Sequence, residues 1–216
     1  MTRTNPFAVI VAEVLIMAFL PCAFAARAHS YSGTLLISIF NDAGVAQNVL
    51  ERAEDRTAEI FAAAGIEVHW ILCDREPEKS VRALEIENCA SFDSPSRLSV
   101  RIVARGSTVG KDVFGEAILD ESGHGVYAKV YYSSEFASFS DEWLDEGAML
   151  GCVMAHEVGH LLLGPNSHSS EGLMRAHWLR DELHQASVHF LFFTSRDAAS
   201  MRSRFAKDVN ALRNKS

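Results

Sequence analysis

The sequence predicts an α/β or α+β fold with a mixed, twisted sheet, and three observations indicate this class. Segments with the apolar pattern of strands alternate with segments that have helical periodicity along residues 30–216. A strand–helix–strand run comes first, further strands follow, and the chain ends in helical segments. No repeat, low-complexity tract or long linker divides these residues, so we expect residues 26–216 to form one domain.

Composition excludes several functional classes. The chain has 216 residues, of which 48% are hydrophobic and 22% are charged, as in ordinary globular proteins. Lys and Arg number 20 against 28 Asp and Glu, which gives a formal net charge of −8. An acidic surface repels phosphate backbones and anionic lipids. We therefore expect no nucleic-acid partner and no peripheral membrane role.

Residues 1–25 have the order of a secretory signal peptide. A lone Arg3 precedes an apolar stretch from Phe7 to Leu20, and the small-residue site Ala23-Phe24-Ala25 follows. Glu13 interrupts the apolar stretch, and a retained anchor is the alternative interpretation. We expect cleavage, secretion to a periplasm or outside the cell, and no stable membrane association afterwards.

The first expected elements are a strand over residues 34–40 and a helix over residues 46–65. The strand, TLLISIF, is apolar on both faces, as a central strand is. The helix has one apolar stripe, and Gly65 is a plausible stop. The stripe consists of Val49, Leu50, Ala53, Ile60 and Phe61.

Two strands with alternating apolar residues are expected over residues 66–72 and 97–104. The inward side chains of the first are Ile66, Val68, Trp70 and Leu72. Those of the second are Leu98, Val100, Ile102 and Ala104.

A hairpin and three helical segments complete the expected fold. Residues 114–119 and 125–132 flank DESGH, a turn sequence. Residues 141–164 are then expected to form a long helix that begins with acidic residues and ends at Gly164. Helical segments near 179–193 and 196–213 close the chain.

Three cysteines follow the expected signal peptide. In an oxidising compartment Cys73 and Cys89 can form a disulfide across the polar residues 74–88, although two free thiols remain the alternative. Cys152 lies one turn before His156, too far from His160 to share a metal with it, and we expect a buried, inert thiol.

The segment His156-Glu157-Val158-Gly159-His160 is an H-E-x-x-H motif. Two imidazoles four residues apart on a helix lie one turn above the other, so both can reach a single ion. Glu157 can take a proton from a metal-bound water and pass it to a leaving amine. Zinc suits this task because it accepts imidazole ligands and keeps a position open for water.

Residues 155–174, AHEVGHLLLGPNSHSSEGLM, resemble the active-site stretch of the metzincin zinc endopeptidases. The resemblance implies that Gly164 ends the helix and that His168 is the third ligand of one catalytic zinc. It also implies that Met174 forms an apolar floor under the metal. A sheet with two main helices, a Met-containing turn and a closing helix are the fold that it implies.

The spacing departs from that of the family at two points. Gly164 lies four residues after His160, and His168 lies four after Gly164, one more than usual in each interval. Other donors nearby are Glu171 and His177. Glu182, on a later helix, is a further candidate, as in thermolysin-like enzymes, where a Glu on a later helix is the third ligand.

The sequence therefore predicts a secreted, monomeric zinc endopeptidase that acts on peptides or proteins. A thermolysin-like peptidase with Glu182 as a ligand and a non-catalytic secreted zinc-binding protein are the alternatives. The resemblance also implies that the strand over residues 125–132 borders the cleft and pairs with extended substrate. Packing as an ordinary edge strand is the other interpretation of this segment.

Overall fold

The computed structural model describes residues 33–73, 89, 96–110, 113–132 and 145–213. The expected signal peptide over residues 1–25 lies outside these residues, as do residues 141–144 of the expected long helix. In this part of the chain, no helix combines the length and the apolar character needed to cross a membrane.

The structure contains a five-stranded mixed sheet with the strand order β2-β1-β3-β5-β4. Strands β2, β1, β3 and β5 are parallel, and β4 pairs antiparallel with β5 at the edge. This arrangement confirms the predicted α/β class. The strands are β1 (Thr34–Asn41), β2 (Glu67–Leu72), β3 (Arg97–Ala104), β4 (Gly115–Ile118) and β5 (Tyr127–Tyr132).

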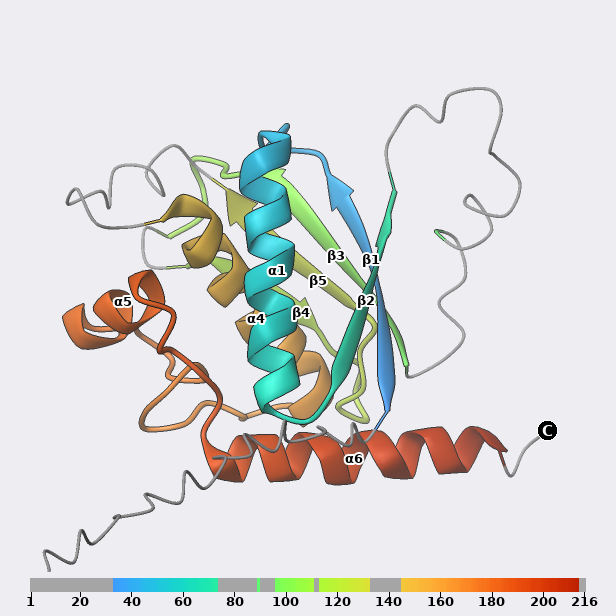
Figure 1. The fold of residues 1–216 in the computed structure, drawn as a ribbon. Coiled ribbons are helices and arrows are strands. Elements are labelled where there is room, and N and C mark those ends of the chain that lie inside the picture. The colour runs from blue at the N-terminus through green and yellow to red at the C-terminus, as the bar shows by residue number, and fades with distance from the viewer. Residues whose placement is uncertain (1–32, 74–88, 90–95, 111–112, 133–144, 214–216) are drawn as a thin grey trace, which may run out of the picture.

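Helices α1 and α4 lie side by side over one face of this sheet, and α6 crosses below its lower end (Figure 1). All five residues of the predicted apolar stripe of α1 are buried, so the helical periodicity identified its core face correctly. The helices are α1 (Gln47–Ala63), α4 (Glu146–Leu163), α5 (Arg180–Ser187) and α6 (Ser195–Arg213).

Helix α4 begins later than the expected residue 141 because Asp145 caps it. The Asp145 carboxylate accepts hydrogen bonds from the backbone N–H groups of Gly147 at 2.8 Å and Ala148 at 3.2 Å. Almost every residue of α4 is buried, from Gly147 to Leu162 with the exception of His160. A buried helix accommodates polar side chains only where they have hydrogen-bonding or metal partners. We therefore expect such partners for its histidines and for Glu157.

Three expectations about burial and length are wrong. Leu72 is 43% exposed, because it ends the edge strand β2. Ala104 is exposed at the last position of β3. The helix expected near 179–193 ends at Ser187, because His189 adopts a φ of 61° and Arg56 donates a hydrogen bond to the Leu191 carbonyl at 2.8 Å.

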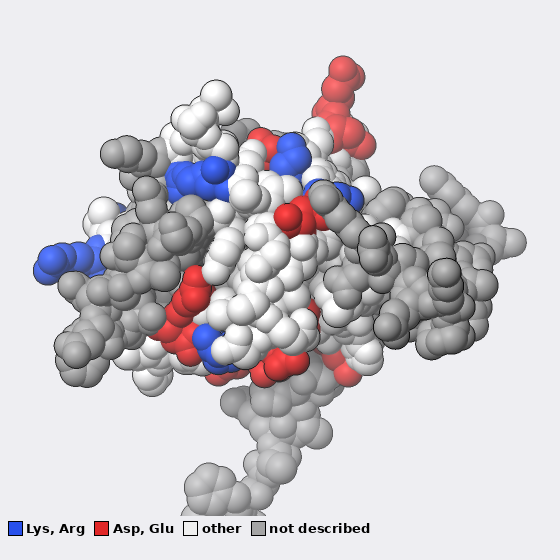
Figure 2. Space-filling model, turned by 90° about the horizontal axis from the view of Figure 1, so that it is seen from above, with Lys and Arg blue, Asp and Glu red and all other residues white. Residues whose placement is uncertain are grey.

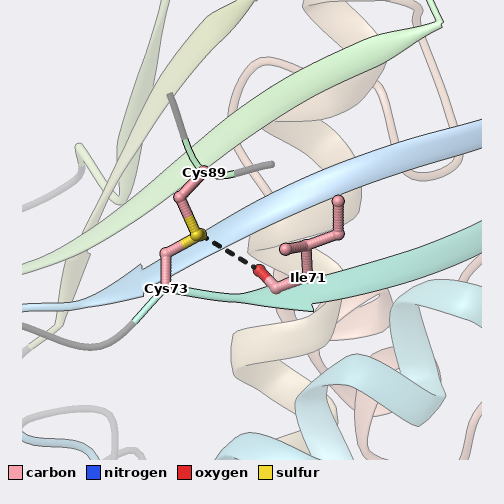
Figure 3. Close-up of a disulfide and its surroundings, with 3 residues drawn as sticks. All are labelled: Ile71, Cys73 and Cys89. Atoms are coloured by element: carbon pink, nitrogen blue, oxygen red, sulfur yellow. Dashed lines mark hydrogen bonds between the residues drawn. A yellow bond between two sulfur atoms is a disulfide. The ribbon is translucent and has the colours of Figure 1, made fainter. Parts of the chain in front are cut away.

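The predicted disulfide between Cys73 and Cys89 is present, with their Cα atoms 5.8 Å apart. It follows the end of β2, where the Cys73 N–H donates a hydrogen bond to the Ile39 carbonyl of β1. Figure 3 shows the bridge beside Ile71, whose carbonyl oxygen lies 3.6 Å from the Cys73 sulfur. Cys152 is a buried free cysteine, as expected.

Charge is mixed on the face that Figure 2 shows, the upper end of the molecule in Figure 1. On the part of this face that the structure describes, acidic and basic side chains are scattered round an uncharged central area. This view agrees with the modest acidic excess of the sequence, in which charges of both signs are interspersed.

Candidate metal centre

Two histidines project from α4 toward a common point. Their Nε2 atoms, in His156 and His160, are 3.1 Å apart. His156 Nδ1 lies 2.7 Å from the Leu173 carbonyl, which can only accept, so Nδ1 carries the hydrogen and Nε2 presents its lone pair. His160 Nδ1 contacts the Ser167 hydroxyl at 2.8 Å. The polar partners of both rings therefore leave Nε2 available to a metal.

His168 joins these two residues from the loop that follows α4. Its ring centroid is 4.7 Å from that of His160 and 5.6 Å from that of His156. One ligand atom from each of the three histidines lies within 4.8 Å of the others. The fold thus brings together the three residues that the sequence predicted as ligands.

The other candidate ligands lie in different surroundings. Both carboxylate oxygens of Glu182 are engaged, one by Arg175 at 2.8 Å and the other by the Leu179 N–H at 2.8 Å. Among the described residues, neither Glu171 nor Glu182 belongs to the group formed by the three histidines. His177 is exposed and lines the same cleft as His168.

The chain reverses direction after α4 at Gly164. This residue has a φ of 86°, and a Cβ there would collide with the Arg204 guanidinium. Arg204 of α6 donates hydrogen bonds to the carbonyls of Leu163 and Gly123, so it joins the helix end to the β4–β5 turn. A glycine is therefore required for the turn that carries His168 back toward α4.

Met174 is fully buried against α4. Its sulfur faces Gly159, where a Cβ would approach it to 2.7 Å. The Met174 carbonyl accepts a hydrogen bond from the Ser169 N–H at 2.8 Å, and the Leu173 N–H donates to the Phe192 carbonyl at 2.9 Å. These contacts, with the one between His156 Nδ1 and the Leu173 carbonyl, hold the segment that follows His168 against α4.

Burial lowers the pKa of all three histidines and so favours their neutral form. Burial lowers the pKa of His156 to about 4. Burial, followed by the nearby His156 and His168, lowers the pKa of His160 to about 3. The pKa of His168 is lowered by burial and by His177. Neutral imidazole is the form that binds metal ions.

Glu157 is a buried carboxyl, 6% exposed, beside β4. A Cβ at Gly115 would lie 2.6 Å from its Cγ and 2.7 Å from its Oε1, so a side chain at this position would have to displace either the carboxyl group or the strand. Burial, with a smaller contribution from Glu116, raises the pKa of Glu157 to about 8.

The histidines and Glu157 lie in a cleft of about 630 Å³. Its lining includes Val113–Ala117 and Leu119, in and around β4, and Arg175–Trp178 and Leu183, which follow the loop of His168. The expectation that residues 125–132 form the edge strand is wrong, because the strand order places β5 between β3 and β4. Strand β4 is the edge strand at this cleft.

The sequence did not predict that Gly115 and Ser167 belong to the candidate site. The position of Gly115 depends on the strand order, for which the sequence contains no direct signal. Ser167 directly precedes His168, and this adjacency was the one signal available for it.

No family model matches this sequence, and no curated protein matches it. Solved structures that are similar to the chain include the following two. Archaemetzincin from Methanopyrus kandleri has 14% identity and a TM-score of 0.47, over 83% of this chain and 98% of that protein. Metalloproteinase-II from Bacteroides fragilis has 17% identity and a TM-score of 0.47, over 82% of this chain and 54% of that protein.

Proposed function

We propose that this chain is a secreted zinc-dependent endopeptidase in which His156, His160 and His168 hold one zinc ion and Glu157 is the general base. The observation that supports this proposal best is the convergence of three neutral imidazoles beside a buried carboxyl group in an open cleft. Three protein ligands with a further position left for water are typical of catalytic zinc sites, whereas structural sites are closed by four.

The two donor nitrogens from α4 have a separation that suits zinc. Two nitrogens bound to a tetrahedral zinc at about 2.0–2.1 Å lie about 3.3 Å from each other. The Nε2 atoms of His156 and His160 are 3.1 Å apart, close to this value. When bound, zinc supplies a Lewis acid that lowers the pKa of a water in its open position toward about 7.

In this mechanism Glu157 moves the proton. Its carboxylate accepts a proton from the attacking water and then donates it to the nitrogen of the leaving amine. Burial raises the pKa of this carboxyl group, and a bound zinc ion would lower it again, because a nearby positive charge favours the carboxylate that accepts the proton. The glycine at position 115 gives this carboxyl the space beside β4 that it needs.

The substrate binds in the cleft as an extended peptide. Within the described residues, β4 has β5 on one side and no strand on the other. An exposed strand edge can pair with an extended backbone by main-chain hydrogen bonds. We therefore place the peptide along β4, in the cleft that Arg175–Trp178 also line.

Residues 1–25 act in this proposal as a cleaved signal peptide, and residues 26–216 form a single, monomeric peptidase domain. The disulfide between Cys73 and Cys89 supports an oxidising compartment, because such bridges persist outside the reducing cytosol.

The test uses mature protein and the Glu157→Gln variant. We expect the wild type to bind one zinc, to lose peptidase activity with a strong chelator and to regain it on zinc addition. Glu157→Gln should keep the zinc and lower kcat by about 10²–10⁴-fold or more, because the proton carrier is lost. Zinc binding without any peptidase activity in the wild type favours a non-catalytic protein instead.

The third ligand is tested separately by zinc retention. We expect His168→Ala to weaken zinc binding strongly and Glu182→Ala to leave its affinity near that of the wild type. The reverse result assigns the site to the thermolysin-like arrangement with a Glu ligand. Competition with a chromophoric chelator measures both affinities.

A further inference from the structure

Arg175, which lines the cleft, forms an ion pair with Glu182. Arg175 Nη1 donates to Glu182 Oε1 at 2.8 Å, and Glu182 Oε2 accepts from the Leu179 N–H at 2.8 Å. The Glu182 side chain is 8% exposed, whereas that of Arg175 is 34% exposed and lines the cleft. The carboxylate is therefore buried and fully engaged, and the guanidinium remains accessible.

The guanidinium has more donors than this contact uses. Arginine presents five N–H groups in a planar fork, and Glu182 is the one side-chain partner of Arg175 among the described residues. Because Glu182 holds it in place, little side-chain entropy remains to be lost when a second acceptor binds. An anchored arginine with unused donors is suited to a second carboxylate.

The charges along the cleft support the same inference. Arg175 is the one Lys or Arg among the described lining residues, and His177, two residues further along the chain, also lines the cleft. The acidic side chains of the lining, Glu116 and Glu157, belong to β4 and α4, and Glu116 is already paired with Lys129 at 2.9 Å. A negatively charged group on the substrate is therefore favoured on the Arg175 side of the cleft.

Resting on the endopeptidase function proposed above, we infer that Arg175 is a specificity residue that binds a carboxylate of the peptide substrate. The carboxylate comes from an Asp or Glu side chain near the scissile bond or from the C-terminus of a short peptide. Both sources present the same planar acceptor to the guanidinium fork.

A set of matched peptides tests this preference with zinc-loaded protein. In one arm a single Glu or Gln is placed at each position near the cleaved bond, and in the other arm one peptide has a free or an amidated C-terminus. We expect kcat/KM to be about tenfold higher for the carboxylate member of one such pair. The arm that shows the difference identifies the source of the carboxylate.

The variant that tests the residue is the double change Arg175→Met and Glu182→Gln. Changing both partners avoids a buried, unpaired carboxylate, and the oxygen of the new amide can still accept from the Leu179 N–H. We expect the carboxylate-to-amide ratio to fall to about one. A ratio measured within one protein is insensitive to how much of that protein is folded. Arg180→Met, on the exposed surface of α5, is the matched control and should keep the wild-type ratio.

The outcomes separate this inference from the function on which it rests. Cleavage of the peptides by the wild type without a carboxylate preference overturns the inference alone. A preference that persists in the double variant overturns the role of Arg175. Absence of cleavage of every peptide by zinc-loaded protein overturns the proposed function and this inference together.

Discussion

Ser167 is the polar partner of the second histidine of α4. Its hydroxyl lies 2.8 Å from His160 Nδ1, and it comes from the same loop as His168. When His160 Nε2 presents its lone pair to a metal, Nδ1 carries the hydrogen and the Ser167 oxygen is the acceptor. One loop thus supplies a candidate ligand and the group that orients another.

We expect Ser167→Ala to lower zinc affinity by about 10–100-fold, the usual effect of losing a hydrogen-bond partner of a metal ligand. Competition against a chromophoric chelator measures it. Ser167→Thr keeps the hydroxyl and should retain most of the affinity. Ser170→Ala, at an exposed position of the same loop, is the control. Equal affinities of the Ser167→Ala variant and the wild type would show that the hydroxyl does not orient His160.

Gly115 leaves the space in which the Glu157 carboxyl lies. A Cβ at this position would be 2.6 Å from Glu157 Cγ, so Gly115→Ala must displace either the carboxyl or the strand. We expect kcat to fall by about 10²-fold with zinc stoichiometry kept, because a base moved by about 1 Å is badly placed for proton transfer. Steady-state kinetics with metal analysis measures this.

Another glycine supplies the comparison for that variant. At Gly106 a Cβ would have its nearest neighbour 3.9 Å away, so Gly106→Ala should leave kcat unchanged. A normal kcat in the Gly115→Ala variant contradicts the idea that the glycine is needed for the base. A higher KM with an unchanged kcat would assign Gly115 to substrate binding instead.

At the scale of single elements, sequence periodicity predicted the parts of the fold that face the core. The stripe of α1 and the inward residues Leu98, Val100 and Ile102 of β3 are buried as expected. The predicted burial is wrong at the ends of strands, as at Leu72 and Ala104. The alternation of apolar and polar residues does not show where neighbouring elements stop covering a strand. Burial at a strand end depends on tertiary packing, which periodicity does not contain.

The sequence predicted the part of the candidate site whose residues lie close together in the chain. His156, Glu157 and His160 share one helix, so their proximity follows from helical geometry. His168 was expected from the family resemblance, and its role as a ligand stays a prediction. The position of β4 at the cleft was not predictable, because the crossover that places β5 inside the sheet is a long-range feature.

Helix α1 contains an acidic group whose ionisation opposes folding. Burial, together with Asp55 and Glu51, raises the pKa of Glu54 to about 7. The ordinary value is 4.5, so the folded state binds the proton more tightly than the unfolded state. Stability from this group is therefore present below about pH 4.5 and is lost as the pH rises to about 7.

Glu54→Gln should accordingly raise the melting temperature at pH 8 and change it little at pH 4.5. Thermal melts of both proteins at the two pH values measure the difference. Glu121→Gln, on the exposed turn between β4 and β5, is the control and should show no such pH-dependent gain. A gain of equal size at both pH values would contradict an ionisation effect and indicate a general helix preference for Gln.

At the scale of the whole molecule, the disulfide and the candidate metal centre lie at opposite edges of the sheet. The bridge from Cys73 follows β2, the first strand in the sheet order, whereas the cleft borders β4, the last. Strands β1, β3 and β5 separate the two edges. Interactions this far apart contribute to stability almost independently.

We therefore expect the double change Cys73→Ser and Cys89→Ser to lower global stability without changing the metal centre. The bridge joins residues 16 apart in sequence, and closing a loop of that size is worth about 3 kcal/mol in the chain-entropy account. Urea unfolding measures this loss, while zinc affinity and kcat/KM should stay near wild-type values under conditions where the variant is folded. Cys152→Ser in buried α4 separates loss of a bridge from loss of a sulfur, because Cys152 forms no disulfide. A fall in zinc affinity in the double cysteine variant while it remains folded would show that the two edges are coupled through the sheet.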